Sequence, residues 1–289
     1  MEDHASPSFR PVAYVAAAAT IVAALTLSLV DEKVHIIILA YATLIQPVGS
    51  VLVLFLAAWV AGRHVLKITR VPETDPYVRA FYSLALGFGL LSVLAPALGG
   101  ISLLKAPFVN ILMGVLILSG LPGLISTLKR PVSGGPEHRQ LHSGFWEMAI
   151  FSGLVFAALF YFLSALSYPV SYDVLEYHLG SVFQSLRESS LKPQPHVFYS
   201  ALPFGAEALY ALGLVLENGT YYTPKLINCG LVLAGAWGMA LLIIAWGLER
   251  PWALLGALLF LLNRLVVSVG LDAFVEPAQT VFVLAALLT

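Results

Sequence analysis

The stretch Ser167–Tyr222 reads SYPVSYDVLEYHLGSVFQSLRESSLKPQPHVFYSALPFGAEALYALGLVLENGTYY and is the only long break between apolar blocks. It holds carboxylates, two histidines and many tyrosines. The blocks on either side contain few side chains that could do chemistry. We therefore expect the blocks to anchor the chain and this stretch to carry its functional groups.

The composition predicts a membrane protein that crosses the bilayer several times. Of 289 residues, 59% are hydrophobic and 11% are charged, whereas a soluble domain has about 25% charged residues. Only an apolar solvent tolerates this balance. The net charge of −1 does not point to a nucleic-acid partner. The one cysteine, Cys229, has no partner for an internal disulfide.

Eight apolar runs approach the roughly 20 residues that a helix needs to cross the hydrocarbon. They are Pro11–Val30, His35–Ala61, Val78–Leu98, Pro107–Leu128, Phe145–Leu166, Pro224–Leu248, Trp252–Val269 and Leu271–Thr289. We expect helices throughout, because lipid offers no partner for unpaired backbone groups, and thus an all-α protein with about eight spans. The last two runs are short or unfinished, so we expect the chain to continue beyond residue 289.

Lysine and arginine predict the orientation. They gather between the second and third runs, between the fourth and fifth, and before Trp252, at Arg63, Lys67, Arg70, Arg79, Lys129, Arg130, Arg139 and Arg250. These loops are expected in the cytoplasm together with the N-terminus, at the plasma (inner) membrane. Residues 167–223 then form an extracytoplasmic loop. Within it, Phe204–Leu216 is too short to span and is expected to lie on, or dip into, the outer surface.

Three parts follow from this arrangement. Residues 1–130 are expected to form a four-span bundle, residues 131–144 a cytoplasmic linker rich in Gly and Pro, and residues 145–289 the functional half.

The first part of the loop, Tyr172–Arg187, has the spacing of an amphipathic helix. Its apolar side chains recur at helical spacing and predict a stripe lying in the membrane interface; they are Leu175, Leu179, Val182, Phe183 and Leu186. Asp173 and Glu176 stand at its start. Their spacing is that of a capping box, and it also suits two carboxylates at the water–lipid boundary. Both interpretations stay open.

Several other polar side chains stand at membrane edges. The candidates for substrate binding are Arg264, Lys225, Glu207, His178, Tyr172 and Tyr210, and two further acidic candidates are Asp272 and Glu276. Ordinary explanations compete for each: a first helical turn for Glu207, solvated helix ends for Asp272 and Glu276, and snorkelling for Arg264. His178 is a candidate metal ligand or base, although no metal-ligand spacing supports it as a ligand.

Taken in order, these segments resemble the GT-C class of integral-membrane glycosyltransferases. The likeness covers about 145–289. It consists of an acid opening a long outer loop (Asp173), a Pro-aromatic segment running to Tyr210, and a later acid at an outer span start (Glu276). The aminoarabinose transferases and protein O-mannosyltransferases are similar in this respect.

The resemblance implies roles for these residues. Asp173 becomes the candidate base or metal ligand with Glu176 beside it, and Glu276 becomes the second acid, with Asp272 near. Arg264 or Lys225 would bind a lipid phosphate. The implied substrates are a polyprenyl-phosphate-linked sugar and a glycan, lipid or protein acceptor; a divalent cation, Mg or Mn, remains an open cofactor. No nucleic acid is implied.

Two other functions stay in view. A transporter or flippase of lipid-linked glycans would place charges midway along its spans. A structural subunit of an envelope complex would leave the acids pointing apart. The predicted clustering of charges at one membrane face favours the enzyme.

Overall fold

A computed structural model describes residues 34–70, 75–129, 144–188, 205–217 and 219–289. The chain divides into two compact units, Met1–Ile45 and Gln46–Thr289, and the contacts discussed below lie within the second. The expected span Pro11–Val30 and most of the expected linker 131–144 lie outside the described residues.

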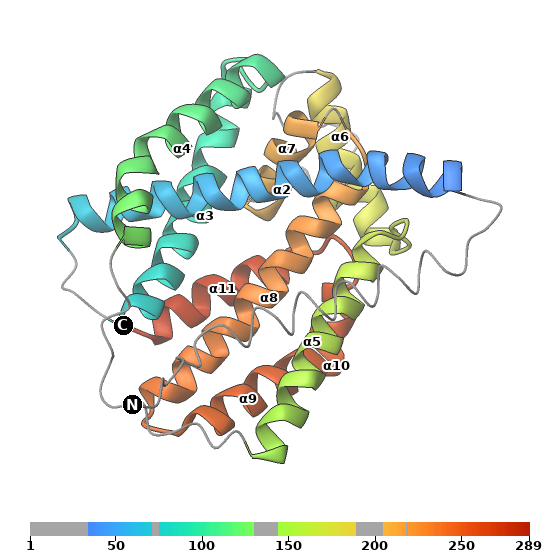
Figure 1. The fold of residues 1–289 in the computed structure, drawn as a ribbon. Coiled ribbons are helices and arrows are strands. Elements are labelled where there is room, and N and C mark those ends of the chain that lie inside the picture. Colours follow the sequence, from blue (N-terminus) through green and yellow to red (C-terminus); the bar gives the residue numbers. More distant parts are fainter. Residues whose placement is uncertain (1–33, 71–74, 130–143, 189–204, 218) are drawn as a thin grey trace, which may run out of the picture. The chain divides into compact units, whose positions relative to one another are not determined.

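All regular elements in the described ranges are helices (Figure 1), which confirms the all-α class. They are α2 (Val34–Ile68), α3 (Pro76–Gly100), α4 (Ala106–Lys129), α5 (Phe145–Ala165), the π-helical turn η1 (Val174–His178), α6 (Gly180–Arg187), α7 (Ala206–Glu217), α8 (Tyr222–Ala245), α9 (Arg250–Leu262), α10 (Arg264–Gly270) and α11 (Glu276–Leu287).

Five of the described helices are long and apolar enough to cross a membrane, and α9 with α10 makes a sixth if this bent pair is one span. The five are Leu44–Ile68 of α2, α3, Ala106–Gly123 of α4, α5 and α8. The expected eight spans are therefore found only in part. The run Leu271–Thr289 contributes the 12-residue helix α11, because Glu276 and Pro277 delay its start.

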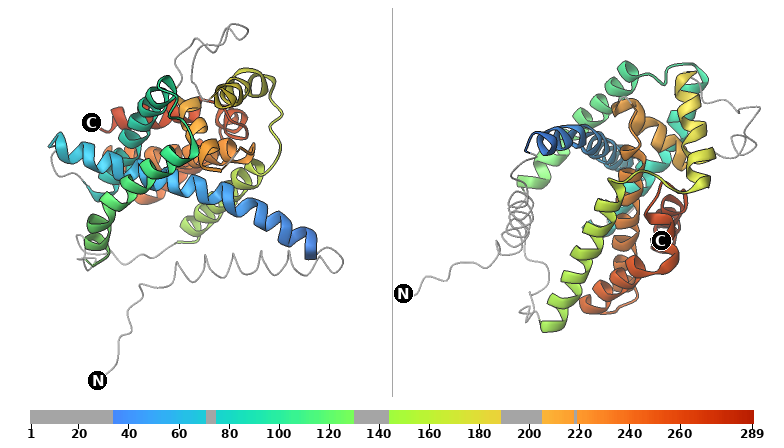
Figure 2. Two further views of the ribbon diagram at one scale, coloured as in Figure 1. Left: turned by 90° about the horizontal axis from the view of Figure 1, so that it is seen from above. Right: turned by 90° about the vertical axis from the view of Figure 1, so that its right-hand side faces the viewer.

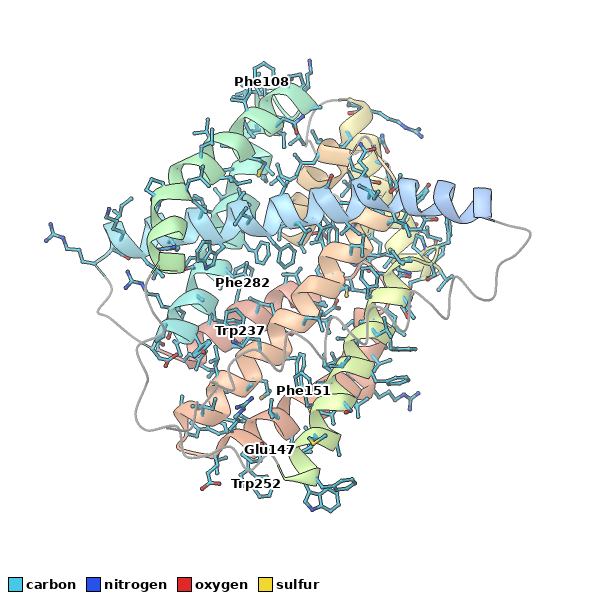
Figure 3. All side chains as sticks on the ribbon, viewed as in Figure 1. Phe108, Glu147, Phe151, Trp237, Trp252 and Phe282 are labelled. Atoms are coloured by element: carbon cyan, nitrogen blue, oxygen red, sulfur yellow. The ribbon has the colours of Figure 1, made fainter. Side chains whose placement is uncertain are left out.

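Helix α8 is central and α5 is peripheral. In the most apolar window of α8, 61% of the residues are buried, against 17% in α5. Helix α8 packs against α5, α7, α9 and α11, and the views in Figure 2 agree on these neighbours. Phe108 of α4 and Phe151 of α5 are exposed, whereas Trp237 lies among the helices (Figure 3). Outward aromatic and aliphatic side chains are what a lipid surround accepts.

The short apolar helix α7 is a core element, which corrects the expectation of a helix on the outer surface. Residues 206 and 208–214 are all buried, and α7 packs against α3, α4, α6 and α8. A helix that is apolar on every side needs cover on every side, and here protein supplies it. Helices from both halves of the sequence thus share one core.

The apolar stripe of Tyr172–Arg187 also packs mainly on protein, not in the membrane interface. Val174, Leu179 and Val182 belong to the main core, and Leu175 is 39% exposed. The cause is the π turn, in which the Leu179 amide bonds the Val174 carbonyl at 2.8 Å. One extra residue in the turn rotates the buried face away from regular α spacing.

Helices α2 and α3 cross at small residues. A Cβ built on Gly62 would lie 1.7 Å from the carbonyl oxygen of Ser83, and one on Gly87 would lie 1.7 Å from that of Ala58. Both helices therefore carry two small residues four apart, the spacing that lets helix backbones touch in membranes. The expectation of close packing is confirmed for Gly87.

A bend of 61° separates α9 from α10. In an unbroken helix the Leu265 amide would donate to the Leu261 carbonyl. Instead, that amide donates to Asn263 Oδ1 at 2.9 Å, and that carbonyl accepts from the Tyr161 hydroxyl at 2.8 Å. Both groups of the lost backbone bond are thus satisfied by side chains, which makes the break compatible with an apolar surround.

Candidate functional site

Four helix ends meet around the segment that follows α5. Ser167, Val170 and Ser171 of this segment bond to the first turn of α8 and to the connection between α10 and α11. The C-terminal ends of α5 and α10 and the N-terminal ends of α8 and α11 therefore lie together. We call this region the polar end of the bundle.

Asp272 clamps that segment. Its Oδ2 accepts the amides of Val170 and Ser171 at 3.0 and 2.9 Å, and its Oδ1 accepts the amide of Ala273 at 3.0 Å. The residue is 4% exposed. A carboxylate with three amide donors is well satisfied. Asp272 thus holds backbone in place, in contrast to the solvated helix end or reacting acid expected from the sequence.

Lys225 is a second clamp on the same segment. Its ammonium donates to Ser167 Oγ at 2.9 Å and interacts electrostatically with Asp272. With 2% of its surface exposed, Lys225 is covered by protein. Its contacts with Ser167 and Asp272 favour a supporting role.

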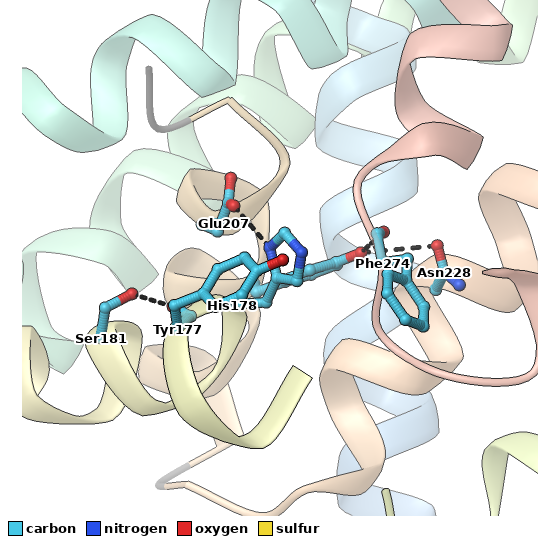
Figure 4. A network of polar contacts seen from close by, with 7 residues as sticks. Tyr177, His178, Ser181, Glu207, Asn228 and Phe274 are labelled. Atoms are coloured by element: carbon cyan, nitrogen blue, oxygen red, sulfur yellow. Dashed lines mark hydrogen bonds and ion pairs between the residues drawn. The ribbon is translucent and has the colours of Figure 1, made fainter. Parts of the chain in front are cut away.

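Tyr210 and Asn228 connect α7, α8 and the α10–α11 connection (Figure 4). The Tyr210 hydroxyl donates to the Phe274 carbonyl and lies 3.4 Å from Asn228 Oδ1. Asn228 Nδ2 donates to the carbonyls of Val269 (2.9 Å) and Asp272. Burial raises the pKa of Tyr210 well above 10, helped by the charges of Glu207, Glu276 and Asp272, so this hydroxyl stays protonated.

His178 and Glu207 form a pair that the sequence did not predict. His178 Nδ1 lies 2.8 Å from Glu207 Oε1, and the side chains are 8% and 12% exposed. The last residue of η1 thereby meets the first turn of α7 (Figure 4). Both residues were candidates singly, but they are 29 positions apart and no local spacing links them.

Asp173, Glu176 and Tyr172 lie together on the solvent side of η1. All three are exposed, and Asp173 makes no capping hydrogen bond through its side chain. The capping box is therefore not formed, because the π turn replaces a regular first turn. A hydrogen bond to Glu176, then the charges of Glu176 and Asp173, raise the pKa of Tyr172.

Glu276 and Arg264 are also exposed. Glu276 opens α11 and acts electrostatically on Tyr210, which brings it to the polar end of the bundle. Arg264 opens α10, whose other end leads to Asp272. The two ends of this seven-residue helix are six residue steps apart, about 9 Å along its axis. Arg264 is thus displaced from the cluster toward the middle of the bent pair.

Sequence reasoning missed Asn228 and Ser167, which join the cluster from α8 and from the segment after α5. Asn228 carried a usable signal, since an amide within an apolar span needs a partner. As for metals, no group of three or more His, Cys, Asp or Glu side chains that could hold an ion occurs in the part of the chain described. Asp173 and Glu176 remain the predicted ligands of any divalent cation.

These features define the class of the protein: a multi-pass helical membrane protein with a cluster of ionisable side chains at one end of its helices. No family model, no curated protein and no solved structure matched the chain in comparison.

Proposed function

We propose that this protein is a membrane glycosyltransferase of the GT-C type. It would transfer a sugar from a polyprenyl-phosphate carrier to a glycan, lipid or protein acceptor. The observation that carries the proposal is the gathering of ionisable groups at a single end of the bundle. These acids come from three elements: Asp173 and Glu176 from η1, Glu207 from α7 and Glu276 from α11. Asp173 follows the clamped Ser171 by two residues, and Glu207 and Glu276 act electrostatically on Tyr210.

The chemistry of such a donor suits this place. A polyprenyl chain stays in the hydrocarbon, so the bond between sugar and phosphate is presented at the boundary with water. The enzyme must take a proton from the acceptor hydroxyl and stabilise the departing phosphate. Exposed Asp173 and Glu176 are the candidates for the base or for the ligands of a divalent cation such as Mg or Mn. The tyrosine beside them, Tyr172, would line the sugar site.

The distribution of basic residues supports an extracytoplasmic reaction. The helix ends opposite to the polar end adjoin Arg250, and Lys and Arg prefer the cytoplasmic side. The polar end would then face outward from the plasma membrane. Lipid-linked sugars are the natural donors there, because their use requires no nucleotide.

The second candidate function is a transporter or flippase of lipid-linked glycans. The bend between α9 and α10, with exposed Arg264 at the break, favours it. Interrupted helices in transporters line binding sites near the middle of the membrane. A flippase would need Arg264 and would move intact donor; a transferase would need Asp173 and would cleave it.

The test uses the full-length protein in proteoliposomes with undecaprenyl-phosphate-linked glucose, galactose, mannose and arabinose. Release of undecaprenyl phosphate is followed by mass spectrometry, with cell-envelope extract as acceptor. We expect Asp173→Asn and Glu276→Gln to lower the rate about a hundredfold or more, the scale of general acid–base catalysis. Glu147→Gln, at the opposite end of α5, is the matched control. Full activity in both variants would overturn the proposal, and movement of uncleaved donor across the bilayer would establish the flippase.

A further inference from the structure

We propose that His178, oriented by Glu207, is the proton acceptor of the site. The inference rests on the transferase function proposed above, and it decides between the two roles left open there for Asp173. With the proton taken by His178, Asp173 and Glu176 are left to bind a cation or the sugar.

The imidazole is held on three sides. Glu207 Oε1 lies 2.8 Å from Nδ1, the ring of Tyr177 is centred 4.4 Å away, and the ring of Phe274 is centred 5.8 Å away in an edge arrangement. Figure 4 shows His178 between α7 and the loop that carries Phe274. The side chain thus has one orientation, as a group that must meet a reacting atom requires.

The pairing also selects the tautomer. A carboxylate accepts hydrogen bonds, so Nδ1 carries the proton that faces Glu207 and the lone pair is on Nε2. Among the residues the structure describes, none forms a hydrogen bond with Nε2. A carboxylate on one nitrogen and a second nitrogen without a hydrogen-bond partner in the described part of the chain is the arrangement by which an imidazole serves as a general base.

Asp173 lacks this support. It is exposed and its side chain makes no capping hydrogen bond. Water competes for an exposed carboxylate. Histidine, in contrast, is the side chain most often used for proton transfer near neutral pH. The buried pair is the better oriented of the two candidates.

The acceptor hydroxyl gives its proton to His178 Nε2 while its oxygen forms a bond to the anomeric carbon of the sugar. The bond from that carbon to the phosphate oxygen breaks, and the carrier phosphate leaves with the electron pair. His178 then returns the proton to water. Glu207 is a positioning residue, because it acts only through the imidazole.

The test measures sugar transfer by the full-length protein, as above, with His178→Ala and His178→Gln. We expect His178→Ala to lose about a hundredfold or more in kcat, and added imidazole to restore part of it. His178→Gln should keep its polar contact with Glu207 and the melting temperature, yet stay inactive and resist rescue. His64→Ala, which changes an exposed histidine on α2 bonded to Ser119, is the matched control and should keep full activity.

Chemical modification gives a readout that does not depend on turnover. Diethyl pyrocarbonate should label His178 at Nε2 in the wild-type protein, and mass spectrometry locates the label. No labelling, or active His178→Ala, would overturn this inference and leave the transferase standing. A third outcome would also overturn this inference, because it would show that the His178–Glu207 pair is only structural. In that outcome, His178→Ala loses activity that imidazole does not restore, and His178→Gln has a lowered melting temperature. A wild-type protein inactive with every donor would overturn the transferase itself.

Discussion

Replacing Asp272 by asparagine tests whether this residue is a clamp, as the structure has it, or a reacting acid. The carboxylate accepts the amides of Val170 and Ser171 through one oxygen and the amide of Ala273 through the other. An asparagine of the same shape has a single acceptor oxygen. Its NH2 group must therefore face one of the donor amides, and the remaining bonds lose the help of a charge.

The size of the effect follows from these bonds. A hydrogen bond to a charged group contributes about 1 kcal/mol more than a neutral one. For the two bonds to Val170 and Ser171 the loss is about 2 kcal/mol, or about thirtyfold in the equilibrium for local opening. The loss of the charge near Lys225 adds to it.

Hydrogen exchange measures this opening directly. Pro169 has no amide hydrogen, so a peptide covering 168–173 reports mainly on the two clamped amides and their neighbours. We expect those amides to exchange about thirtyfold faster in Asp272→Asn. Glu249→Gln, an exposed acid with no capping bond, should change nothing. Exchange within twofold of wild type would refute the clamp, and the acid would return to the list of reacting groups.

Three further variants probe other parts of the structure. Gly62→Ala should lower the free energy of unfolding by about 1–3 kcal/mol or more, because the added methyl group forces α2 away from α3; the variant should unfold at a lower SDS concentration. Gly114→Ala should be neutral, because an added Cβ there would meet no atom within 4 Å. Burial raises the pKa of Glu217 above 4.5, so the stability of the wild-type protein should fall as the pH rises from 4.5 through that raised value. The melting temperature of Glu217→Gln should equal that of the wild type at pH 4 and exceed it at pH 8. Tyr161→Phe leaves the Leu261 carbonyl at the helix break unsatisfied and should cost about 1–3 kcal/mol by thermal melting; an unchanged melting temperature would mean that another group reaches that carbonyl.

The membrane-spanning helices were more predictable from the sequence than the contacts at the polar end of the bundle. Runs of apolar residues predicted α3, α5 and α8 closely, because the length of a spanning helix depends only on bilayer thickness. The same reasoning placed α7 on the outer surface, since a short apolar helix looks alike whether lipid or protein covers it. It also missed the bend at Asn263, which depends on a hydroxyl from a distant helix, Tyr161.

For the site, the residue types were predictable and their partners were not. Asp173, Glu176, His178, Glu207 and Asp272 stood out in the sequence because charge is costly near lipid. Spacing along the chain could not tell which of them would be exposed and which would be covered.

By itself the sequence therefore determined the class of the protein and the stretch in which many of its polar side chains gather. Both follow from local quantities, the hydrophobicity of a window and the rarity of charge within it. Only the tertiary structure decided that His178 meets Glu207 and that Asp272 and Lys225 hold the segment after α5. These contacts join residues 29 to 102 positions apart, and such pairs form only when helices pack. Packing also determines which acid is tied to backbone and which stays exposed.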